Sequence, residues 1–442
     1  MIPGGDLLSA GVIGFVFLLL LGCAELWARV GDPRPEYTRK LVHLGGGVIS
    51  LSFPFLIHSP WVIFVMVFLL SALFWLGAEK GFLKSIHSVK RSSRGSEYYP
   101  LAIFFVFLLS VDRVWIYLAS VLVLALADSL ASLVGGQYGR IRYEVGSSSK
   151  SLEGSLAFML LAFFSIYFPC LFMTDHPCLV CLLCALFVAL LVTGFEAISL
   201  HGSDNIFVPI GVCVILGKIT LQPFHEILFQ TFSLFVICVL TVFAVRRSRS
   251  FNTAGTIMFA LFAYGAWALG SVFWAMPILL AFVVYAFVWT RYPLASKLVA
   301  AVKIEVMFPA LLVPLVLLVC SNSWGGESIF YAPYLAAWAT VSAFTFCNHF
   351  LMYRQCGRNE RLVAAVLFGV GSWLIVVVPQ WLFLRSFPLK TLLMTGVTVT
   401  AVSVIHDWLL GKQPLITPER AWTASRLALT LAVALAVMVF NL

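Results

Sequence analysis

Charged residues are scarce in this chain, and their scarcity excludes most classes of protein. Only 11% of its 442 residues are Asp, Glu, Lys or Arg, whereas 62% are hydrophobic and the mean hydropathy is +1.02. Soluble globular domains carry about 25% charged residues, so the chain is not one of them. Its apolar runs are near the length of about 20 residues that crosses a hydrocarbon core. We therefore expect an all-α, polytopic membrane protein.

The apolar runs predict about 16 transmembrane helices. The first group runs near 7–28, 41–57, 60–78, 98–111, 113–134, 154–173, 178–200, 206–221 and 226–245, and the second near 254–272, 274–290, 300–319, 331–351, 362–384, 391–410 and 422–440.

Basic residues are distributed unevenly between the connections. Of the 28 Lys and Arg residues, about 24 fall on one side of the predicted membrane. Cytoplasmic loops carry Lys and Arg in excess, so that side is predicted to be cytoplasmic, with both termini on the other side. The net charge of +9 therefore reflects topology and attraction to anionic lipids, and it indicates no nucleic-acid partner. We expect a bacterial inner membrane, or an endoplasmic-reticulum or plastid membrane in a eukaryote.

Several familiar signals are missing. The segment Leu7–Ala28 is too long for a signal-peptide core and lacks a convincing cleavage site. The Walker pattern G-x-x-x-x-G-K-[ST] is absent, so a P-loop is not expected. The series Cys178, Cys181 and Cys184 could suggest a soft-metal site. No clustered His or carboxylate joins it, so we interpret the ten cysteines as small hydrophobic residues.

Three polar elements interrupt the apolar runs, and the first is RKLVHLGGG. In it Arg39, Lys40 and His43 lie where the chain enters the second predicted span. If this segment is helical, Lys40 and His43 lie on one face, because residues three apart are neighbours on a helix. Taken alone, the two basic residues would be interpreted as anchors at the headgroup level.

The second element is ADSLASLVGGQYGRIRYEVGSSSKSLEGS, from Ala127 to Ser155. A charged side chain at the bilayer centre costs at least about 2.5–3.5 kcal/mol. Asp128 ends one apolar run and Glu153 begins the next, so both carboxylates need a reason to be there. Binding of phosphate or of a metal ion would explain these two carboxylates.

Glycine, serine and lysine in the second element indicate phosphate binding. Gly135, Gly136 and Gly139 predict a loop that turns backbone N–H groups toward an anion. Ser149 offers a hydroxyl, and Lys150 can contact a phosphate as a point charge. The sequence SLEGS then begins a helix, whose N-terminus also favours phosphate.

The third element is GFEAISLHGSDNIFVPIGV, which carries Glu196, Asp204 and Asn205. Mg²⁺ in nucleotide sites is usually held by one or two carboxylates together with phosphate oxygens. Asp128, Asp204 and Asn205 would suit that role. In isolation Asp204 and Asn205 are equally well interpreted as turn residues and helix caps.

In order and spacing these elements resemble the polyprenol kinase family, which comprises dolichol, phytol and farnesol kinases and a CTP-dependent diacylglycerol kinase. The resemblance covers about residues 1–245. Its first motif is RKxxH (Arg39, Lys40, His43), and its third is E followed by D-N-x-x-x-P (Glu196, Asp204, Asn205, Pro209). The second motif is D-x-x-A with glycines leading into K-S-x-E-G-S (Asp128, Ala131, Gly135, Gly139, Lys150, Ser151, Glu153, Gly154, Ser155). One departure is Ala127, where relatives usually have Gly before the Asp.

The resemblance implies transfer of the γ-phosphate of a nucleotide, often CTP, to the hydroxyl of a lipid alcohol. It implies Mg²⁺ held by Asp128, Asp204 and Asn205. The nucleotide would contact Arg39, Lys40, Gly135, Gly139, Ser149, Lys150, Ser151 and Gly154. The catalytic candidates are His43, Asp128, Lys150, Glu153 and Glu196, and the sequence leaves the general base open among His43, Glu153 and Glu196.

Two other function classes stay open. The second element is also similar to that of phosphatidate cytidylyltransferases, which use CTP on lipid phosphates. A transporter of lipids or small molecules also carries many spans with ionisable groups, but midplane helix breaks and inverted repeats are not detected here. The RKxxH and E…DN elements favour the kinases.

The chain is predicted to have two parts. Residues 1–249 form the kinase-like membrane domain, and residues 250–442 form an additional multi-span domain of unknown role. We detect no motif and no repeat of the first part in the second. Neighbouring polar residues there, such as His406 and Asp407, are interpreted as helix-end polar groups. The sequence makes no prediction about the oligomeric state.

Overall fold

The computed structural model describes most of the chain as helices. The described residues are 4–31, 33–80, 85, 95–146, 148–200, 202–247, 253–291, 304–324, 326–353, 357–384, 387–410 and 421–441. Within these ranges the regular structure is helical except for one two-stranded hairpin, which confirms the predicted all-α class.

The chain divides into two compact units, Met1–Cys238 and Val239–Leu442. The boundary lies close to the one predicted between 1–249 and 250–442. The role of the second part stays a prediction.

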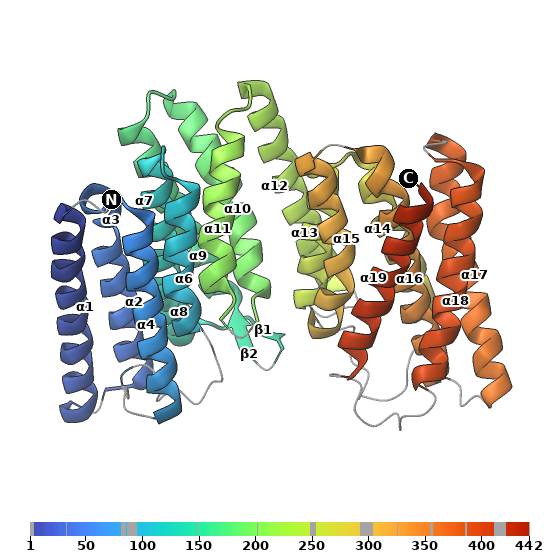
Figure 1. Cartoon of the computed structure of the whole chain (residues 1–442), viewed down its shortest axis with the longest axis horizontal. Coiled ribbons are helices and arrows are strands. Elements are labelled where there is room, and N and C mark those ends of the chain that lie inside the picture. The colour runs from blue at the N-terminus through green and yellow to red at the C-terminus, as the bar shows by residue number, and fades with distance from the viewer. Residues whose placement is uncertain are drawn as a thin grey trace. The chain divides into compact units, whose positions relative to one another are not determined.

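Each span predicted in the first part overlaps a helix of the first unit (Figure 1). The elements are α1 (Gly4–Val30), α2 (Pro35–Ser50), α3 (Phe53–Leu56), α4 (Pro60–Lys80), α6 (Gly95–Leu109), α7 (Val114–Leu122), the π-helical turn η1 (Val123–Ala127), α8 (Asp128–Tyr138), β1 (Arg142–Val145), β2 (Ser148–Ser151), α9 (Leu152–Met173), α10 (Cys178–Ile198), α11 (Asp204–Ile219) and α12 (Phe224–Arg247).

The second unit is a helical bundle around α16. Its helices are α13 (Thr253–Leu269), α14 (Val272–Arg291), α15 (Ile304–Trp324), α16 (Glu327–Tyr353), α17 (Arg358–Leu384), α18 (Leu389–Leu410) and α19 (Ala421–Asn441). The most apolar part of α16 is largely buried, and its Tyr334 hydroxyl donates to the carbonyl oxygen of Trp274 at 2.7 Å. Buried aromatic side chains such as Tyr334 and Trp274 therefore form part of this core.

Nine helices in the described part of the chain are long and apolar enough to cross a membrane, which confirms the polytopic class. They span Gly5–Val30, Pro60–Gly77, Val114–Tyr138, Leu152–Met173, Cys178–Ile198, Phe224–Phe243, Glu327–Asn348, Arg358–Leu384 and Leu389–Leu409. Other helices are apolar but shorter. The two 16-residue helices α2 and α11 belong to neither group, and they carry the first and third polar elements. The total of about 16 spans stays a prediction.

One π-helical turn lies in the middle of the helix that carries Asp128. The segments α7, η1 and α8 follow one another without a break, and η1 ends at Ala127, directly before Asp128. A π-turn widens the helix locally and is frequent at functional sites. Ala127, the residue that departs from the family pattern, is fully buried in this turn.

Helix α2 packs directly on this turn at Gly47. A Cβ atom on Gly47 would overlap the Cβ of Ala125 and lie 2.9 Å from the hydroxyl oxygen of Tyr99. No side chain larger than hydrogen fits there unless the helices separate.

We expect Gly47→Ala to destabilise the protein by about 1–3 kcal/mol, because the added methyl forces α2 away from η1. Thermal unfolding in detergent would measure the effect as a lower midpoint. Gly22→Ala is the matched control, since no atom lies within 4 Å of a Cβ at this helical position. Equal midpoints for the two variants would contradict the packing argument.

Candidate functional site

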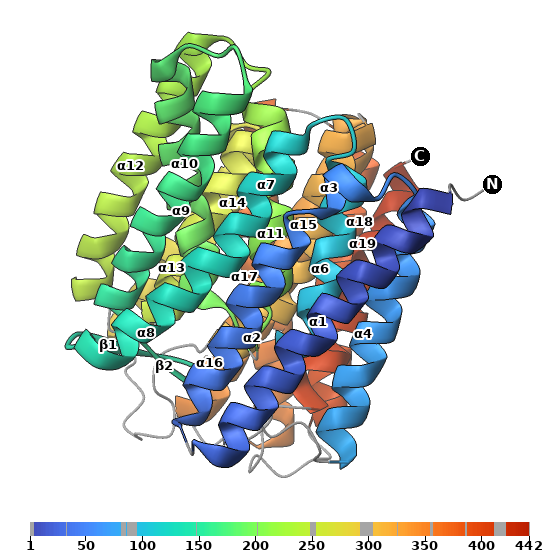
Figure 2. The same cartoon turned by 90° about the vertical axis from the view of Figure 1, so that its left-hand side faces the viewer.

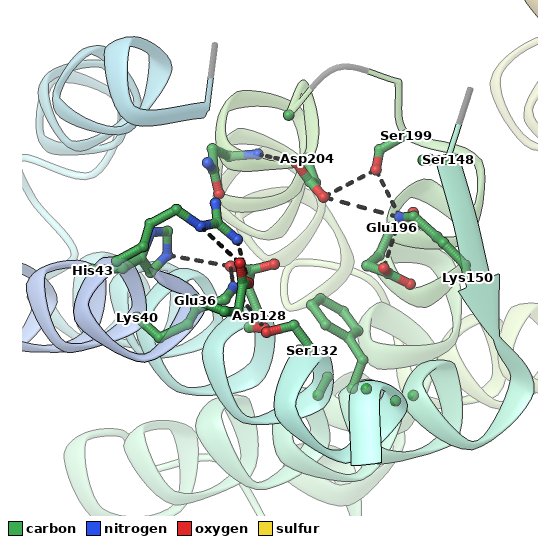
Figure 3. A pocket seen from close by; sticks show the side chains of 18 of the residues that line it. Glu36, Lys40, His43, Asp128, Ser132, Ser148, Lys150, Glu196, Ser199 and Asp204 are labelled. Atoms are coloured by element: carbon green, nitrogen blue, oxygen red, sulfur yellow. Dashed lines mark hydrogen bonds and ion pairs between the residues drawn. The ribbon is translucent and has the colours of Figure 1, made fainter. Parts of the chain in front are cut away.

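One cavity of about 490 Å³ in the first unit brings the three polar elements together. Its polar wall comes from α2, α8, the hairpin, the first turn of α9, the end of α10 and the start of α11. Figure 3 shows its polar side chains in two groups, with Glu36, Lys40, His43 and Asp128 in one and Lys150, Glu196, Ser199 and Asp204 in the other. Segments far apart in the sequence therefore meet at one site.

The predicted glycine loop is wrong in its conformation. Gly135 and Gly136 lie inside α8, where helical hydrogen bonding uses their N–H groups. Gly135 instead lets α8 approach α9, because a Cβ there would lie 2.9 Å from Ser151 Oγ and 3.2 Å from Gly154 Cα. Gly139 ends α8, and a Cβ on it would lie 2.7 Å from Ser151 Cβ. These glycines permit a close helix contact rather than an anion-binding loop.

A short hairpin brings Lys150 to the cavity. Strands β1 and β2 pair antiparallel, with Tyr143 opposite Lys150. Gly146 lies in the turn at a φ of 60°, which glycine adopts readily. The helix predicted to begin at SLEGS is α9, and its N-cap Ser151 accepts a hydrogen bond from Gly154 N at 3.1 Å. The hairpin itself was not predicted.

Lys40 and Asp128 form the first ion pair. Lys40 Nζ lies 2.7 Å from Asp128 Oδ2 and 3.2 Å from the Asp128 carbonyl oxygen. The two side chains are 6% and 19% exposed, so water hydrates neither charge well and each is compensated mainly by the other. Arg39 pairs separately with Glu36 at 2.6 Å and interacts electrostatically with Asp128 and Asp204.

His43 lies beside this ion pair, on the face of α2 that it was predicted to share with Lys40. Its Nε2 is 3.5 Å from Asp128 Oδ2 and 2.9 Å from the carbonyl oxygen of Leu124. A carbonyl oxygen only accepts, so this bond assigns the hydrogen to Nε2 and leaves the lone pair on Nδ1. The Tyr99 ring contacts His43 edge-on, with ring centroids 4.4 Å apart, and its hydroxyl donates to the His43 carbonyl oxygen at 3.1 Å.

Lys150 holds the third element against the hairpin. Its Nζ lies 2.7 Å from Glu196 Oε1, 2.8 Å from Ser199 Oγ and 3.9 Å from Asp204 Oδ2, and it also donates to the Glu196 carbonyl oxygen. Ser199 Oγ donates in turn to Asp204 Oδ2 at 3.0 Å. One ammonium group is therefore shared by two carboxylates, from the end of α10 and the start of α11.

The same carboxylates set the charge of Lys150. Burial alone would lower the pKa of this amine, but the attraction of Glu196 and Asp204 outweighs burial and raises the pKa of Lys150 above its ordinary value. Lys150 is therefore an ammonium group at neutral pH.

Asn205 supplies an oxygen atom beside Asp204. The residue is 5% exposed, and its Nδ2 donates to the Gly95 carbonyl oxygen at 2.9 Å. Its Oδ1 has no hydrogen-bond partner among the described residues. A carboxylate and an unpaired amide oxygen are ligands that a hard divalent cation accepts. Within the described residues no group of three or more His, Cys, Asp or Glu side chains forms a metal cage, so phosphate oxygens would have to complete the shell.

Two predicted site residues lie outside the cavity. Both carboxylate oxygens of Glu153 accept the N–H of Ile141, at 3.2 and 3.3 Å, so this side chain stabilises the entry to the hairpin. Gly139 does not line the cavity either. The other predicted residues all line it: Arg39, Lys40, His43, Asp128, Gly135, Ser149, Lys150, Ser151, Gly154, Glu196, Asp204 and Asn205.

Some lining residues had not been predicted. Glu36 and Ser199 stand three positions from Arg39 and Glu196, so i,i+3 spacing could have found them. Tyr99 carried no signal, because an aromatic residue in an apolar run is normally a core residue.

Opposite charges line the cavity in equal number. Four are cationic and four are carboxylates, namely Arg39, Lys40, Arg142 and Lys150, and Glu36, Asp128, Glu196 and Asp204. A phosphate ligand that formed ion pairs with Lys40 and Lys150 would leave Asp128 and Glu196 without their cationic partners. The site therefore suits a phosphate ligand that arrives with a divalent cation.

A phytol kinase from Synechocystis sp. (strain ATCC 27184 / PCC 6803 / Kazusa) is similar to this chain. The two are 35% identical over 214 residues, which cover 47% of this chain, in its first half, and 88% of the relative. No family model and no solved structure matches the chain. The match takes in nearly the whole relative and the half of this chain that carries the cavity. The chain therefore belongs, through its first half, to the polyprenol kinase family, which includes the phytol kinases.

Proposed function

We propose that the first half of this chain is a membrane kinase that transfers the γ-phosphate of a nucleoside triphosphate to the hydroxyl of an isoprenoid or lipid alcohol. One observation carries the proposal: the ion pairs Lys40–Asp128 and Lys150–Glu196 line the same cavity. The name of the relative, phytol kinase, supports the same class of reaction.

Phosphoryl transfer asks a protein mainly for positioning and for charge neutralisation. Lys150 is suited to hold the triphosphate, because it is a fixed ammonium on a hairpin whose Ser149 hydroxyl lines the same cavity. Ser151 begins α9 next to it, so the positive end of that helix dipole also faces the site. Lys40 and Arg39 supply positive charge from the facing helix.

Bound Mg²⁺ would neutralise charge on the phosphate oxygens. Asp128, Asp204 and Asn205 are the residues suited to hold it, since both carboxylates line the cavity and Asn205 Oδ1 has no partner among the described residues. If phosphate oxygens engaged Lys40 and Lys150, Asp128 and Asp204 would be free to hold the metal ion.

In the transfer step the alcohol oxygen bonds to the γ-phosphorus, and the bond from that phosphorus to the β,γ-bridging oxygen breaks. The nucleoside diphosphate leaves with that oxygen, and the hydroxyl proton passes to a base on the protein. Of the three sequence candidates for this base, His43 and Glu196 line the cavity, whereas Glu153 does not. We propose that the cavity faces the cytoplasm, where the basic connections are predicted to lie and nucleotide is available.

The proposed reaction is tested by identifying its leaving group. Purified protein with Mg²⁺ would be incubated with CTP or ATP and, in turn, phytol, farnesol, dolichol, diacylglycerol and phosphatidate. We expect a nucleoside diphosphate and a phosphorylated alcohol, with CTP preferred to ATP. Release of pyrophosphate with phosphatidate would instead indicate a cytidylyltransferase. Absence of turnover with every substrate would reject the kinase and favour a transporter.

We expect Asp128→Asn and Asp204→Asn each to lower kcat by on the order of 10²- to 10³-fold, because each removes a negative charge from the reacting centre. Glu153→Gln is the matched control, since its amide oxygen can still accept the Ile141 N–H outside the cavity. It should keep near wild-type kcat. Thermal unfolding would check that the variants are folded, and full activity in both Asp variants would reject their role.

The raised pKa of Lys150 predicts how its contribution to stability depends on pH. Lys150→Met leaves Glu196 and Asp204 without their shared cation, which should cost about 3–5 kcal/mol at neutral pH. The folded-state pKa lies above the ordinary lysine value of about 10.4. The stabilisation is thus fully present below that value and is lost only as the pH rises through the raised pKa.

Thermal unfolding of wild type and Lys150→Met would measure this difference at several pH values. It should stay constant between about pH 7 and about pH 9. A difference that disappeared within that interval would show that Lys150 loses its proton there, and the ion-pair assignment would be wrong.

A further inference from the structure

A second cavity, of about 270 Å³, adjoins the polar one. It lies among α1, the end of α2, α3, α4 and α6, and Figure 2 shows α1, α2 and α4 side by side. Phe17, Leu70 and Tyr99 line both cavities, so the two spaces meet at these side chains. From there the second cavity extends past Gly14 and Phe53.

The lining of this second cavity offers no free polar group. Among the residues that line it, only Ser50 and Tyr99 carry a side-chain oxygen or nitrogen. Ser50 Oγ donates to the Gly46 carbonyl oxygen at 2.8 Å, and the Tyr99 hydroxyl donates to the His43 carbonyl oxygen at 3.1 Å. A sugar or a charged headgroup would find no partner here. A hydrocarbon chain needs no polar partner, so it can enter from the bilayer without loss of a hydrogen bond.

We propose that this apolar cavity binds the hydrocarbon tail of the alcohol substrate, with its hydroxyl end emerging at Tyr99 into the polar cavity. The inference rests on the proposed kinase function and adds a location for the tail. The three side chains that line both cavities support it, because an amphiphilic alcohol needs an apolar site next to a polar one.

The direction of the tail follows from the packing of α1. Beyond the cavity Leu21 and Ala24 pack with Val42 and Phe74, so α1, α2 and α4 are in contact there. The tail therefore runs the other way along α1, from Leu18 toward Ala10. This stretch of helix is about 12 Å long at 1.5 Å per residue, which suits part of a long chain rather than a small alcohol.

The position of the tail also selects between the two remaining base candidates. Tyr99 lies at the junction of the cavities, and its ring centroid is 4.4 Å from that of His43. A hydroxyl that emerges there meets His43 and Asp128. Glu196 belongs to the other group, already engaged by Lys150. The α2 side of the polar cavity is thus the acceptor side, where His43 is the nearer of the two base candidates, and the hairpin side is the nucleotide side.

Gly14→Leu tests the tail site by filling it. No atom lies within 4 Å of a Cβ on Gly14, so the added side chain begins without a clash, and it projects from a position that lines the apolar cavity. Gly11→Leu is the matched control on the same helix, equally free of neighbours but outside the cavity lining. The readout is the ratio of kcat/KM for a long alcohol, phytol, to that for a short one, geraniol.

We expect Gly14→Leu to lower this ratio at least about 10-fold and Gly11→Leu to leave it unchanged, because discrimination in an apolar pocket follows occupied volume. If wild type phosphorylates alcohols and both variants keep its ratio, the tail lies elsewhere and the kinase proposal stands. If wild type phosphorylates no alcohol, the kinase proposal fails independently.

A binding experiment decides the location without turnover. A diazirine-bearing farnesol analogue would be photo-crosslinked to the wild-type protein, and labelled peptides identified by mass spectrometry. Labels on α1 and α4, at Gly14–Leu18 or Met66–Leu70, that excess phytol suppresses would support the site. Labels confined to other helices, or labels displaced equally by phosphatidylcholine and so due to any lipid chain, would overturn it.

Discussion

Opposite charges must stay paired when they leave water, and the site depends on that constraint. Removing one partner of a buried pair typically costs about 3–5 kcal/mol, because the other charge is left without compensation. The pair Lys40–Asp128 therefore fastens α2 to α8, and Lys150–Glu196 fastens the hairpin to α10. The same groups are the ones that a phosphate ligand and its cation would need. The site is stable because its opposite charges pair with one another.

These pairs form only because small residues let the helices approach. Gly47 places α2 against the π-helical turn at Ala125, and Lys40 lies about two helical turns earlier on the same helix, at the level of Asp128. On the other side Gly135 brings α8 to the start of α9, which follows directly on the strand that carries Lys150. Backbone proximity thus fixes the side-chain distances. Gly135 and Gly139 act in helix packing, although the backbone freedom of glycine had suggested a phosphate-binding loop.

Sequence patterns predicted the helices and the residues of the site better than they predicted its shape. Apolar runs locate helices because each must cross a hydrocarbon core, and charges such as Lys40 and Asp204 stand out against them. Helices that are apolar all round carry no period that reveals which face meets which neighbour. The sequence therefore could not predict the apolar cavity or its contact with the polar cavity at Tyr99. Glu153 was misjudged for a related reason, since its backbone partner at Ile141 depends on a hairpin that the sequence did not indicate.

Charge pairing by itself does not identify an active site, as the second unit demonstrates. Asp407 pairs there with Arg361 at 2.9 Å, which ties α18 to α17, and Arg426 donates to His406 at 3.1 Å, which ties α19 to α18. These residues line neither cavity of the first unit. The similar phytol kinase aligns over 88% of its length with the first half of this chain alone. The evidence that Lys40, Asp128 and Lys150 belong to a site is therefore the cavity that their ion pairs line together, and not charge pairing alone.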